Sequence, residues 1–247
     1  MQDIQHGRNF MKADFGRRSN GPSDQQRGVP YPPLQKEAGD GEILALPSVD
    51  QEVISRSDFF TVVEERQSRR KYSDSPLSLA ELSYLLYCTQ GVKQEIRRGY
   101  ATKRTVPSAG ARHPFETYLA INRVESLKSG LYRYLPLSHQ LLSLGAVDDL
   151  PHRLTEANLG QRFVGDAACV FIWSCIPYRA EWRYGSHAHK NMLLDAGHIC
   201  QNLYLAVEAI SAGTCAIGAY DQELMDELLA LDGEDEFVVY LAPVGKP

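Results

Sequence analysis

Residues 66–72 read RQSRRKY, and this cationic stretch decides more about the fold of the chain than any other. Arg66, Ser68 and Arg70 alternate along it, so in an extended segment their side chains project from the same side. A phosphate monoester carries about two negative charges and three acceptor oxygens, which guanidinium groups and hydroxyls bind well. Taken alone, the stretch is equally typical of a solvated cluster of charges.

Two further segments favour a phosphate-binding site over a solvated cluster of charges. Residues 105–114 (TVPSAGARHP) consist largely of turn-forming residues, and such turns leave backbone N–H groups unpaired and available to a ligand. Near the end of the chain, Lys246 adds an ammonium group within the sequence PVGKP. Cations, a hydroxyl and free amides from separate segments together predict a site for a phosphorylated, planar cofactor.

The composition divides the chain into two parts. Its 247 residues are 43% hydrophobic and 23% charged, which suffices for one sizeable core with an appendage. Residues 1–50 form a Pro- and Gly-rich extension with little apolar periodicity, and residues 51–247 form the predicted domain. The extension either wraps around the folded body or a partner subunit, or is a disordered tail.

Within the domain, helices and strands alternate irregularly, which is typical of an α+β fold. Helices are predicted at residues 58–65 and 79–89, and Ser78 with Glu81 forms a capping-box signature before the second. Short β-branched or aromatic runs predict strands at residues 116–122, 131–135, 140–144, 169–175 and 237–241. There is no Gly-x-Gly-x-x-Gly motif of a Rossmann unit.

The longest predicted helix covers residues 189–212. An apolar stripe follows it at steps of three and four residues, and Leu194, Leu205 and Val207 add apolar surface on other faces. Such a helix is buried on more than one side, as in a central or subunit-interface position. His198 on this helix is interpreted as a core histidine that hydrogen-bonds to a neighbouring helix.

Charge and cysteine content exclude several classes of function. The net charge of −5 argues against a nucleic-acid or anionic-membrane surface, and no apolar run is long enough to span a bilayer. The five cysteines lie in apolar runs without Cys-x-x-Cys spacing, so we expect buried, reduced thiols and a cytoplasmic location. His187 and His189 lack a third ligand at suitable spacing, so no metal site is expected.

The order of these motifs resembles the nitroreductase superfamily, and within it the SagB-type dehydrogenase branch, which includes azoline oxidases of peptide maturation. The resemblance runs from about residue 58 to residue 247. The segments that carry it, besides the cationic stretch and the last residues, are 78–91 (SLAELSYLLYCTQG), 104–115, 182–185, 194–203 (LDAGHICQNL) and 217–220.

The resemblance implies a nitroreductase-like fold, in which helices flank a central, mainly antiparallel sheet and two chains form an intertwined homodimer. It implies FMN as cofactor, with the phosphate and ribityl chain bound by Arg66, Gln67, Ser68, Arg70 and Lys246. The turn that reaches the flavin from the other subunit corresponds to Pro107, Ser108, Ala109 and Ala111. The segment whose backbone faces the reactive edge of the ring corresponds to Ile217, Gly218 and Ala219.

One difference from the azoline oxidases concerns the chemistry. Their Lys-Tyr pair, thought to handle the substrate proton, corresponds here to Arg183 and Tyr184, and an arginine is a poor general base because it stays protonated. Tyr184 is therefore the candidate catalytic residue. The expected function is FMN-dependent electron transfer from a reductant such as NAD(P)H to a small organic acceptor. The alternatives are an azoline peptide dehydrogenase and a flavin-binding module without turnover.

Overall fold

The computed structural model describes residues 2–12, 21–97 and 99–247. Within the predicted extension, residues 1–50, the structure does not describe residues 1 and 13–20.

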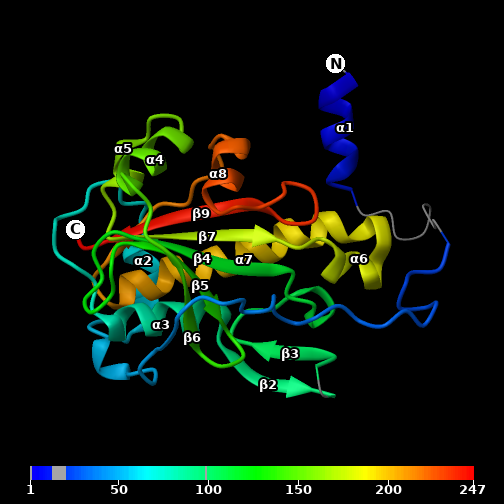
Figure 1. Ribbon diagram of the computed structural model, residues 1–247, viewed down its shortest axis with the longest axis horizontal. Coiled ribbons are helices and arrows are strands. Elements are labelled where there is room, and N and C mark those ends of the chain that lie inside the picture. The colour runs from blue at the N-terminus through cyan, green and yellow to red at the C-terminus, as the bar shows by residue number, and fades with distance from the viewer. Residues whose placement is uncertain (1, 13–20, 98) are drawn as a thin grey trace.

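A seven-stranded sheet forms the centre of the protein, and every neighbouring pair of its strands is antiparallel (Figure 1). In spatial order the strands are β1 (Ile43–Ala45), β6 (Gln140–Gly145), β5 (Gly130–Leu135), β4 (Phe115–Ile121), β7 (Cys169–Cys175), β9 (Phe237–Gly245) and β8 (Gly213–Thr214). A separate hairpin pairs β2 (Val92–Ile96) with β3 (Ala101–Arg104). The five strands that the sequence predicts are confirmed, and so is the α+β class with a mainly antiparallel sheet.

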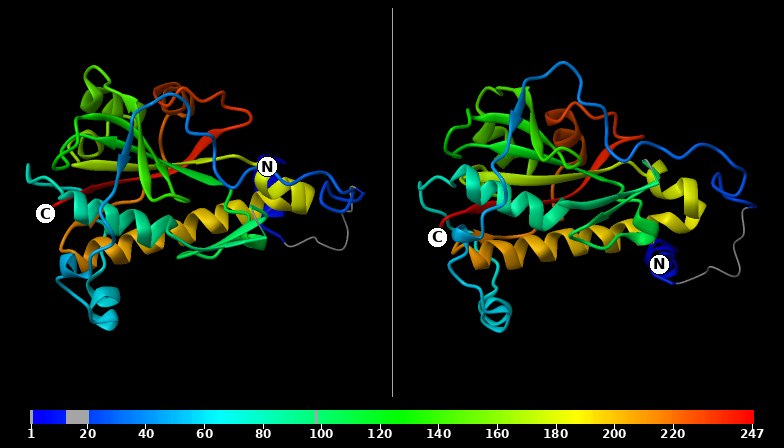
Figure 2. Two further views of the ribbon diagram at one scale, coloured as in Figure 1. Left: turned by 60° about the horizontal axis from the view of Figure 1, so that its bottom comes forward. Right: turned by 90° about the horizontal axis from the view of Figure 1, so that it is seen from below.

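The central strands of the sheet are buried on both sides, because helices cover both of its faces. Leu119 and Phe171 pack in one hydrophobic cluster and their strand neighbours Ala120 and Val170 in the other, as the alternation of side chains requires. The helices on the first face are α3 (Leu79–Gln90) and α7 (Ala188–Ala209), and on the second α4 (Leu150–Ala157), α5 (Arg162–Gly165) and α8 (Gln222–Leu228) (Figures 1 and 2). The remaining α-helices are α1 (Gln2–Phe10), α2 (Phe59–Glu65) and α6 (Tyr178–Tyr184).

The long helix α7 confirms the predicted apolar stripe, whose members are buried, but its C-terminus lies three residues before the predicted one. Ile210 caps the helix, Ser211 adopts a left-handed φ of 56°, and the Ala212 amide donates to the Val207 carbonyl over 2.8 Å. The chain then turns directly into β8. His198 corrects a second expectation, since it is exposed on the side of α7 away from the core.

The capping box at the start of α3 is confirmed. The Glu81 amide donates to Ser78 Oγ over 3.1 Å, and the Ser78 amide donates to Glu81 Oε2 over 2.8 Å. This reciprocal pair satisfies two amides at the helix start and fixes the Glu81 side chain.

Residues 21–37, named the strap below, run in extended and turn conformation along the body (blue in Figures 1 and 2). Strap backbone groups satisfy buried charges of the domain. The Lys36 amide donates to Glu116 Oε1 over 2.8 Å, and the Leu34 carbonyl accepts from Arg104 Nη2 over 3.2 Å. Arg104 and Glu116 are 5% and 2% exposed, so the strap is part of their solvation.

Candidate functional site

The cationic segment lies in extended conformation beside β8. Ser68 forms a parallel bridge with Thr214, and the Arg69 amide donates to the Thr214 carbonyl over 2.9 Å. Alternation along the segment sends the Arg69 side chain inward, where it pairs with the buried Glu208. Ser68 and Arg70 are exposed, and so are Gln67 and Lys71.

Tyr204 of α7 holds this segment against the loop that follows β8. The Arg66 guanidinium carbon lies 5.4 Å from the centre of the Tyr204 ring, and Ser68 Oγ lies 2.9 Å from its hydroxyl. The same hydroxyl accepts a hydrogen bond from the Ala216 amide over 2.8 Å. One phenol therefore ties the predicted phosphate-binding segment to the segment that contains residues 217–219.

Residues 217–219 leave donors open at this place. Ile217 exchanges backbone hydrogen bonds of 2.8 and 3.3 Å with Leu241 of β9, which fixes the start of the segment. Gly218 and Ala219 are exposed, and their amides have no hydrogen-bond partner in the described part of the chain. A Cβ added at Gly218 would meet no atom within 4 Å, so a ligand can approach the backbone closely.

Lys246 lies beside the same segments, but its ammonium is engaged. Its carbonyl accepts from the Ser73 amide over 2.9 Å, whereas Nζ forms an ion pair with Glu81 of the α3 capping box. The Lys246 and Glu81 side chains are 24% and 14% exposed. A phosphate at this place would share the ammonium with a carboxylate.

The residues of this first group fit FMN by their donor chemistry. Arg70 has no carboxylate within salt-bridge distance among the described residues, and Ser68 and the exposed Gln67 add uncharged donors. Guanidinium, hydroxyl and amide donors suit the phosphate and ribityl chain. The free amides of residues 218 and 219 suit the acceptor atoms of a flavin ring.

The turn at residues 107–111 differs from expectation in part, because the chain itself pairs two of its four amides, those of Ala109 and Ala111. The Ala109 amide and Ser108 Oγ donate to the Asp195 carboxylate over 3.1 and 2.6 Å. The Ala111 amide donates to the Ser108 carbonyl over 3.0 Å, and the His113 amide to Ser108 Oγ over 2.9 Å. The expectation of free amides is therefore wrong for Ala109 and Ala111, whereas the amides of Ser108 and Gly110 have no hydrogen-bond partner in the described part of the chain.

Asp195 and His113 are the titratable groups around this turn. Burial raises the pKa of Asp195, although the hydrogen bonds from Ser108 and Ala109 act in the opposite direction. Burial, together with the charge of Arg104, lowers the pKa of His113 to about 3. The neutral imidazole then donates from Nε2 to the Thr102 carbonyl over 3.1 Å.

Tyr184 lies directly against this turn. Gly110 has a left-handed φ of 61°, and a Cβ there would come within 2.5 Å of Tyr184 Oη and 2.9 Å of Arg183 Cδ. Position 110 therefore needs glycine both for its conformation and for the approach of α6. The Arg183 guanidinium carbon lies 5.5 Å from the centre of the Tyr184 ring, so the two side chains form one surface.

The predicted residues form two groups that lie on opposite sides of α7. Asp195, beside the turn, and Tyr204, beside the cationic segment, are nine positions apart in this helix. At about 1.5 Å and about 100° per residue, the two side chains are separated by roughly 13 Å and half a turn. A helix about 10 Å across stands between them. Within one chain, the turn therefore does not face the cationic segment.

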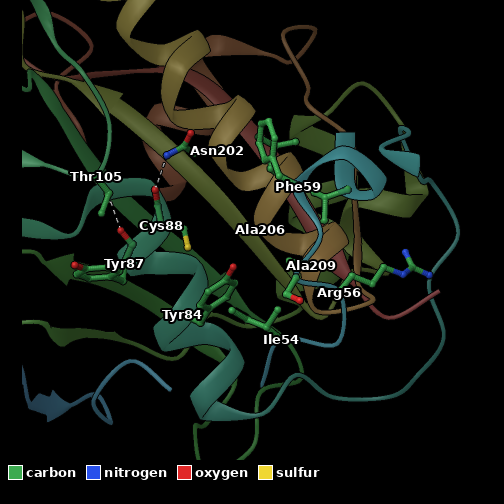
Figure 3. A pocket seen from close by; sticks show the side chains of 13 residues that line it. Ile54, Arg56, Phe59, Tyr84, Tyr87, Cys88, Thr105, Asn202, Ala206 and Ala209 are labelled. Carbon is green, nitrogen blue, oxygen red and sulfur yellow. Dashed lines mark hydrogen bonds between the residues drawn. The ribbon is translucent and has the colours of Figure 1, made fainter. Parts of the chain in front are cut away.

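An apolar groove lies between α2, α3 and α7, near the first group (Figure 3). Its volume is about 370 Å³, and Phe59, which is 70% exposed, stands at its edge. Asn202 Nδ2 donates to the Cys88 carbonyl over 2.8 Å across its wall. Arg56, the cation of the groove, is paired with Glu208 and Glu65, so this hollow does not offer a phosphate site.

Several residues that build the site were not singled out from the sequence. Asp195 lies within the LDAGHICQNL segment, where a carboxylate on an otherwise apolar helix was the available signal. Tyr204 and Glu208 act from the next turns of α7, and only their contacts with residues 66–69 identify them. Arg112 follows the turn and is 1% exposed, although its residue type predicts a surface position.

The chain is similar to known proteins over most of its length. A family model described as "Nitroreductase family" matches residues 63–246. A relative from Methanocaldococcus jannaschii named "Putative nitroreductase MJ1384" is 33% identical over 208 residues, which are 84% of this chain and 98% of the relative. The crystal structure of a "putative nitroreductase" from Ralstonia eutropha matches with a TM-score of 0.68 at 25% identity, over 88% of this chain and 98% of that one.

A second relative is the trifolitoxin-processing protein TfxB of Rhizobium leguminosarum bv. trifolii, which is 28% identical over 141 residues. The match covers 54% of this chain but only 38% of that protein. In the described part of this chain, no helix has the length and apolar character needed to cross a membrane.

Proposed function

The chain belongs to the nitroreductase family of oxidoreductases, and we propose that it is an FMN-dependent enzyme of the SagB-type branch. It transfers electrons from a reductant such as NAD(P)H to a small organic acceptor. The observation that carries the proposal is the approach of three distant segments: Tyr204 of α7 joins residues 66–70 to the loop that contains residues 217–219, and Lys246 bonds to Ser73, just after the cationic segment.

Each segment supplies one kind of contact in this proposal. Arg66, Ser68 and Arg70 bind the phosphate, and Gln67 contacts the ribityl chain. The Lys246 ammonium binds the phosphate when its side chain leaves the ion pair with Glu81. Ile217, Gly218 and Ala219 border the ring, where free amides stabilise negative charge that develops on it during reduction.

The second group completes the site in the partner chain, so we propose an obligate homodimer with two flavin sites. The turn at Pro107, Ser108, Ala109 and Ala111 lies on the far side of α7 from its own cationic segment, and it faces the flavin bound by the other chain. The exposed apolar side chains that support an interface are Phe59 at 70%, Phe60 at 72%, Leu193 at 52% and Leu194 at 54%. A flavin-loaded monomer that is stable at micromolar concentration in sedimentation would contradict the dimer.

Bound FMN supplies the redox chemistry, since a flavin can accept a hydride from one substrate and pass electrons to another. The protein supplies position and protons. Ser108 and the Ala109 amide are fixed by Asp195, so the turn is held in one conformation before substrate binds. Tyr184, beside Gly110, exchanges a proton with the substrate, and Arg183 stabilises negative charge on an acceptor oxygen.

An azoline peptide dehydrogenase is the second candidate, supported by the likeness to a trifolitoxin-processing protein. Arg183 weighs against it, because a guanidinium is a poor base for removing a proton from an azoline ring. A flavin-binding module without turnover is the third. The pocket beside Tyr184, of about 480 Å³, supports an enzyme over a module because it leaves room for a substrate.

The first test is cofactor binding. The purified protein should be yellow, or should take up added FMN, and a colourless protein that does not would contradict the proposal. Arg70→Ala should weaken FMN binding by about 1.5–3 kcal/mol, because a charge-assisted bond to the phosphate is lost. Lys71→Ala is the matched control, since this neighbouring exposed cation lies outside the predicted contacts and should leave FMN affinity unchanged.

The second test addresses the chemistry. Anaerobic stopped-flow experiments measure the flavin absorbance after mixing with NADH, NADPH or a thiazoline peptide. Bleaching of the flavin by a nicotinamide and its recovery with a quinone or nitroaromatic support the proposed function. Rapid bleaching by the thiazoline peptide supports the azoline alternative instead. A flavin that none of these reductants bleaches supports the module.

A cytoplasmic location is part of the proposal. Its support is that all five cysteines are free thiols, four of them buried and Cys88 half-buried. Thiols kept reduced are usual in that compartment.

A further inference from the structure

The strap is joined to a cluster of aromatic rings beneath the turn. The Gln25 amide donates to the Trp182 carbonyl and Trp182 Nε1 donates to the Val29 carbonyl, both over 2.8 Å. The Tyr31 ring meets the rings of Tyr100 and Trp182 edge-on, with centroids 5.7 and 6.5 Å apart. Trp182 is 3% exposed and Tyr31 is 42% exposed, so Tyr31 forms the outer layer of the cluster.

The same rings hold Arg112, the residue that directly follows the turn. Its guanidinium carbon lies 4.9 Å from the centre of the Trp182 ring, and Nη1 donates to the Tyr100 carbonyl over 2.6 Å. Nε donates to the Arg179 carbonyl over 2.9 Å, whereas Nη2 is buried without a hydrogen-bond partner in the described part of the chain. The Trp182 ring therefore helps to hold this partly satisfied guanidinium, together with the two backbone carbonyls.

The strap also forms a wall of the pocket beside Tyr184. Asp24 and Arg27 of the strap line it on one side, and Arg183 and Tyr184 of α6 on the other. Asp24 pairs with Arg27 and accepts from the Tyr178 hydroxyl over 2.7 Å, so its charge is compensated. Arg183 has no carboxylate within salt-bridge distance among the described residues, which leaves a guanidinium and a phenol as donors to a ligand oxygen.

We infer that the strap is a positioning element for the acceptor. Through Tyr31, Trp182 and Arg112 it fixes the turn at residues 107–111, and it closes the pocket in which a quinone-type acceptor presents a carbonyl oxygen to Arg183 and Tyr184. Such an acceptor takes up two electrons and two protons to become a hydroquinone, while the reduced flavin is oxidised. The inference rests on the proposed function for the acceptor, but the fixing of the turn does not depend on turnover.

The kinetic test uses menadione to reoxidise the FMN-loaded protein after reduction by dithionite, which makes the result independent of the natural reductant. Tyr31→Ala should raise the menadione concentration at half-maximal rate about 10-fold and leave the limiting rate within about 2-fold. Tyr31→Phe keeps the ring and should therefore raise this concentration clearly less than Tyr31→Ala does. Unchanged half-saturation in Tyr31→Ala, or equal losses in both variants, would overturn the inference.

The second readout is hydrogen exchange of backbone amides, which needs no activity. In Tyr31→Ala, peptides covering residues 105–115 should exchange about 3–10-fold faster, and peptides covering residues 66–77 should be unchanged. Lys36→Met is the control within the strap, because Lys36 Nζ contacts Glu236 over 2.5 Å, away from the aromatic cluster. If Lys36→Met loosens residues 105–115 as much as Tyr31→Ala, the route through the rings is wrong.

The two readouts separate the failure of this inference from the failure of the proposed function. A protein that does not bind FMN contradicts the proposed function, and its hydrogen exchange still tests the fixing of the turn. A protein that binds FMN but shows no effect of Tyr31→Ala in either readout contradicts the inference alone.

Discussion

The two groups of candidate site residues are built in opposite ways. Around residues 66–70 and 217–219, backbone hydrogen bonds to β8 and β9 fix the chain, while the side chains and amides that could meet a ligand stay open. Around the turn at residues 107–111, Asp195 of α7 accepts from the Ala109 amide and Ser108 Oγ, and Tyr184 of α6 lies directly against Gly110. The first group offers donors, and the second offers a rigid shape.

This difference shows how one site divides its tasks. A phosphate is recognised by charge, and its donors need only be exposed and nearby. A flat ring and a substrate must be placed within a fraction of an ångström, so the surface that meets them needs support from behind. We therefore expect changes behind the turn to affect stability or the use of substrate, through its binding or its turnover, and changes at the cationic segment to affect cofactor affinity.

The largest effect is expected from Glu116→Gln, behind the turn. Glu116 accepts from Arg179 Nη2 over 2.5 Å, and both side chains are at most 3% exposed. Loss of the carboxylate leaves a buried guanidinium unpaired, which should lower the free energy of unfolding by about 3–5 kcal/mol. Urea denaturation measures it, with the exposed Glu156→Gln as control; equal unfolding midpoints of the two variants would contradict the argument.

The next effect is on turnover. Tyr184→Phe removes the hydroxyl beside Gly110 and should lower the rate roughly 10²-fold, or about 2.7 kcal/mol, with FMN affinity nearly unchanged. Steady-state rates and FMN titration measure the two quantities separately. Tyr132→Phe, which loses a hydroxyl bond to the Lys128 carbonyl far from the turn, should keep full activity. A fall in FMN affinity as large as the fall in rate would assign Tyr184 to cofactor binding instead.

His113 should make the turn side sensitive to acid. Its pKa is lowered in the folded protein to about 3 from an ordinary value of 6.5, so the unfolded chain takes up the proton first as the pH falls. Stability is therefore lost between pH 6.5 and about 3, and the contribution of His113 at pH 5 is a loss of about 2 kcal/mol relative to pH 8.

Denaturation at pH 8 and pH 5 measures this loss. His113→Gln should reduce the difference between the two pH values, whereas the exposed His152→Gln should not. The same pH dependence in His113→Gln as in the unmodified protein would mean that other groups cause it.

The smallest effect is expected at Lys246, on the cationic side. Its ion pair with Glu81 is partly exposed, so Lys246→Met should cost no more than about 1 kcal/mol of stability. FMN affinity should fall about 5–10-fold, because one of several cations is lost from the phosphate. Thermal unfolding and calorimetric titration measure the two, with the exposed Lys103→Met as control. A larger loss of stability than of cofactor affinity would make Lys246 a structural residue.

Much of the fold follows from local patterns in the sequence. Strand periodicity at residues 169–175 and the Ser78–Glu81 capping box depend on neighbours within a few positions, and both are confirmed. The end of α7 was predicted too late, because Ile210 and Ala212 continue the apolar pattern although Ser211 leaves the helix. Hydrophobic spacing alone does not reveal such a cap.

The candidate site is predictable only where the residue type itself indicates the chemical role. Alternating arginines at 66 and 70 do so, and the structure exposes Gln67, Ser68 and Arg70. Asp195 and Arg112 do not, because their role comes from contacts with residues 87 and 70 positions away, such as Ser108 and Trp182. The strap shows the same limit, since its composition suits both a disordered tail and a segment that docks on Trp182.

The central claim is that each flavin site joins the cationic segment of one chain to the turn of the other. Mixed dimers test it most directly, with one chain carrying Arg70→Ala and the other Pro107→Glu; Pro107 is exposed, so this change should spare the fold of the single chain. Both homodimeric variants should bind FMN weakly. The mixed dimer, isolated with two different affinity tags, should contain one site with both changes and one intact site. The account predicts one tightly bound FMN per mixed dimer, and a mixed dimer without a tight site would contradict it.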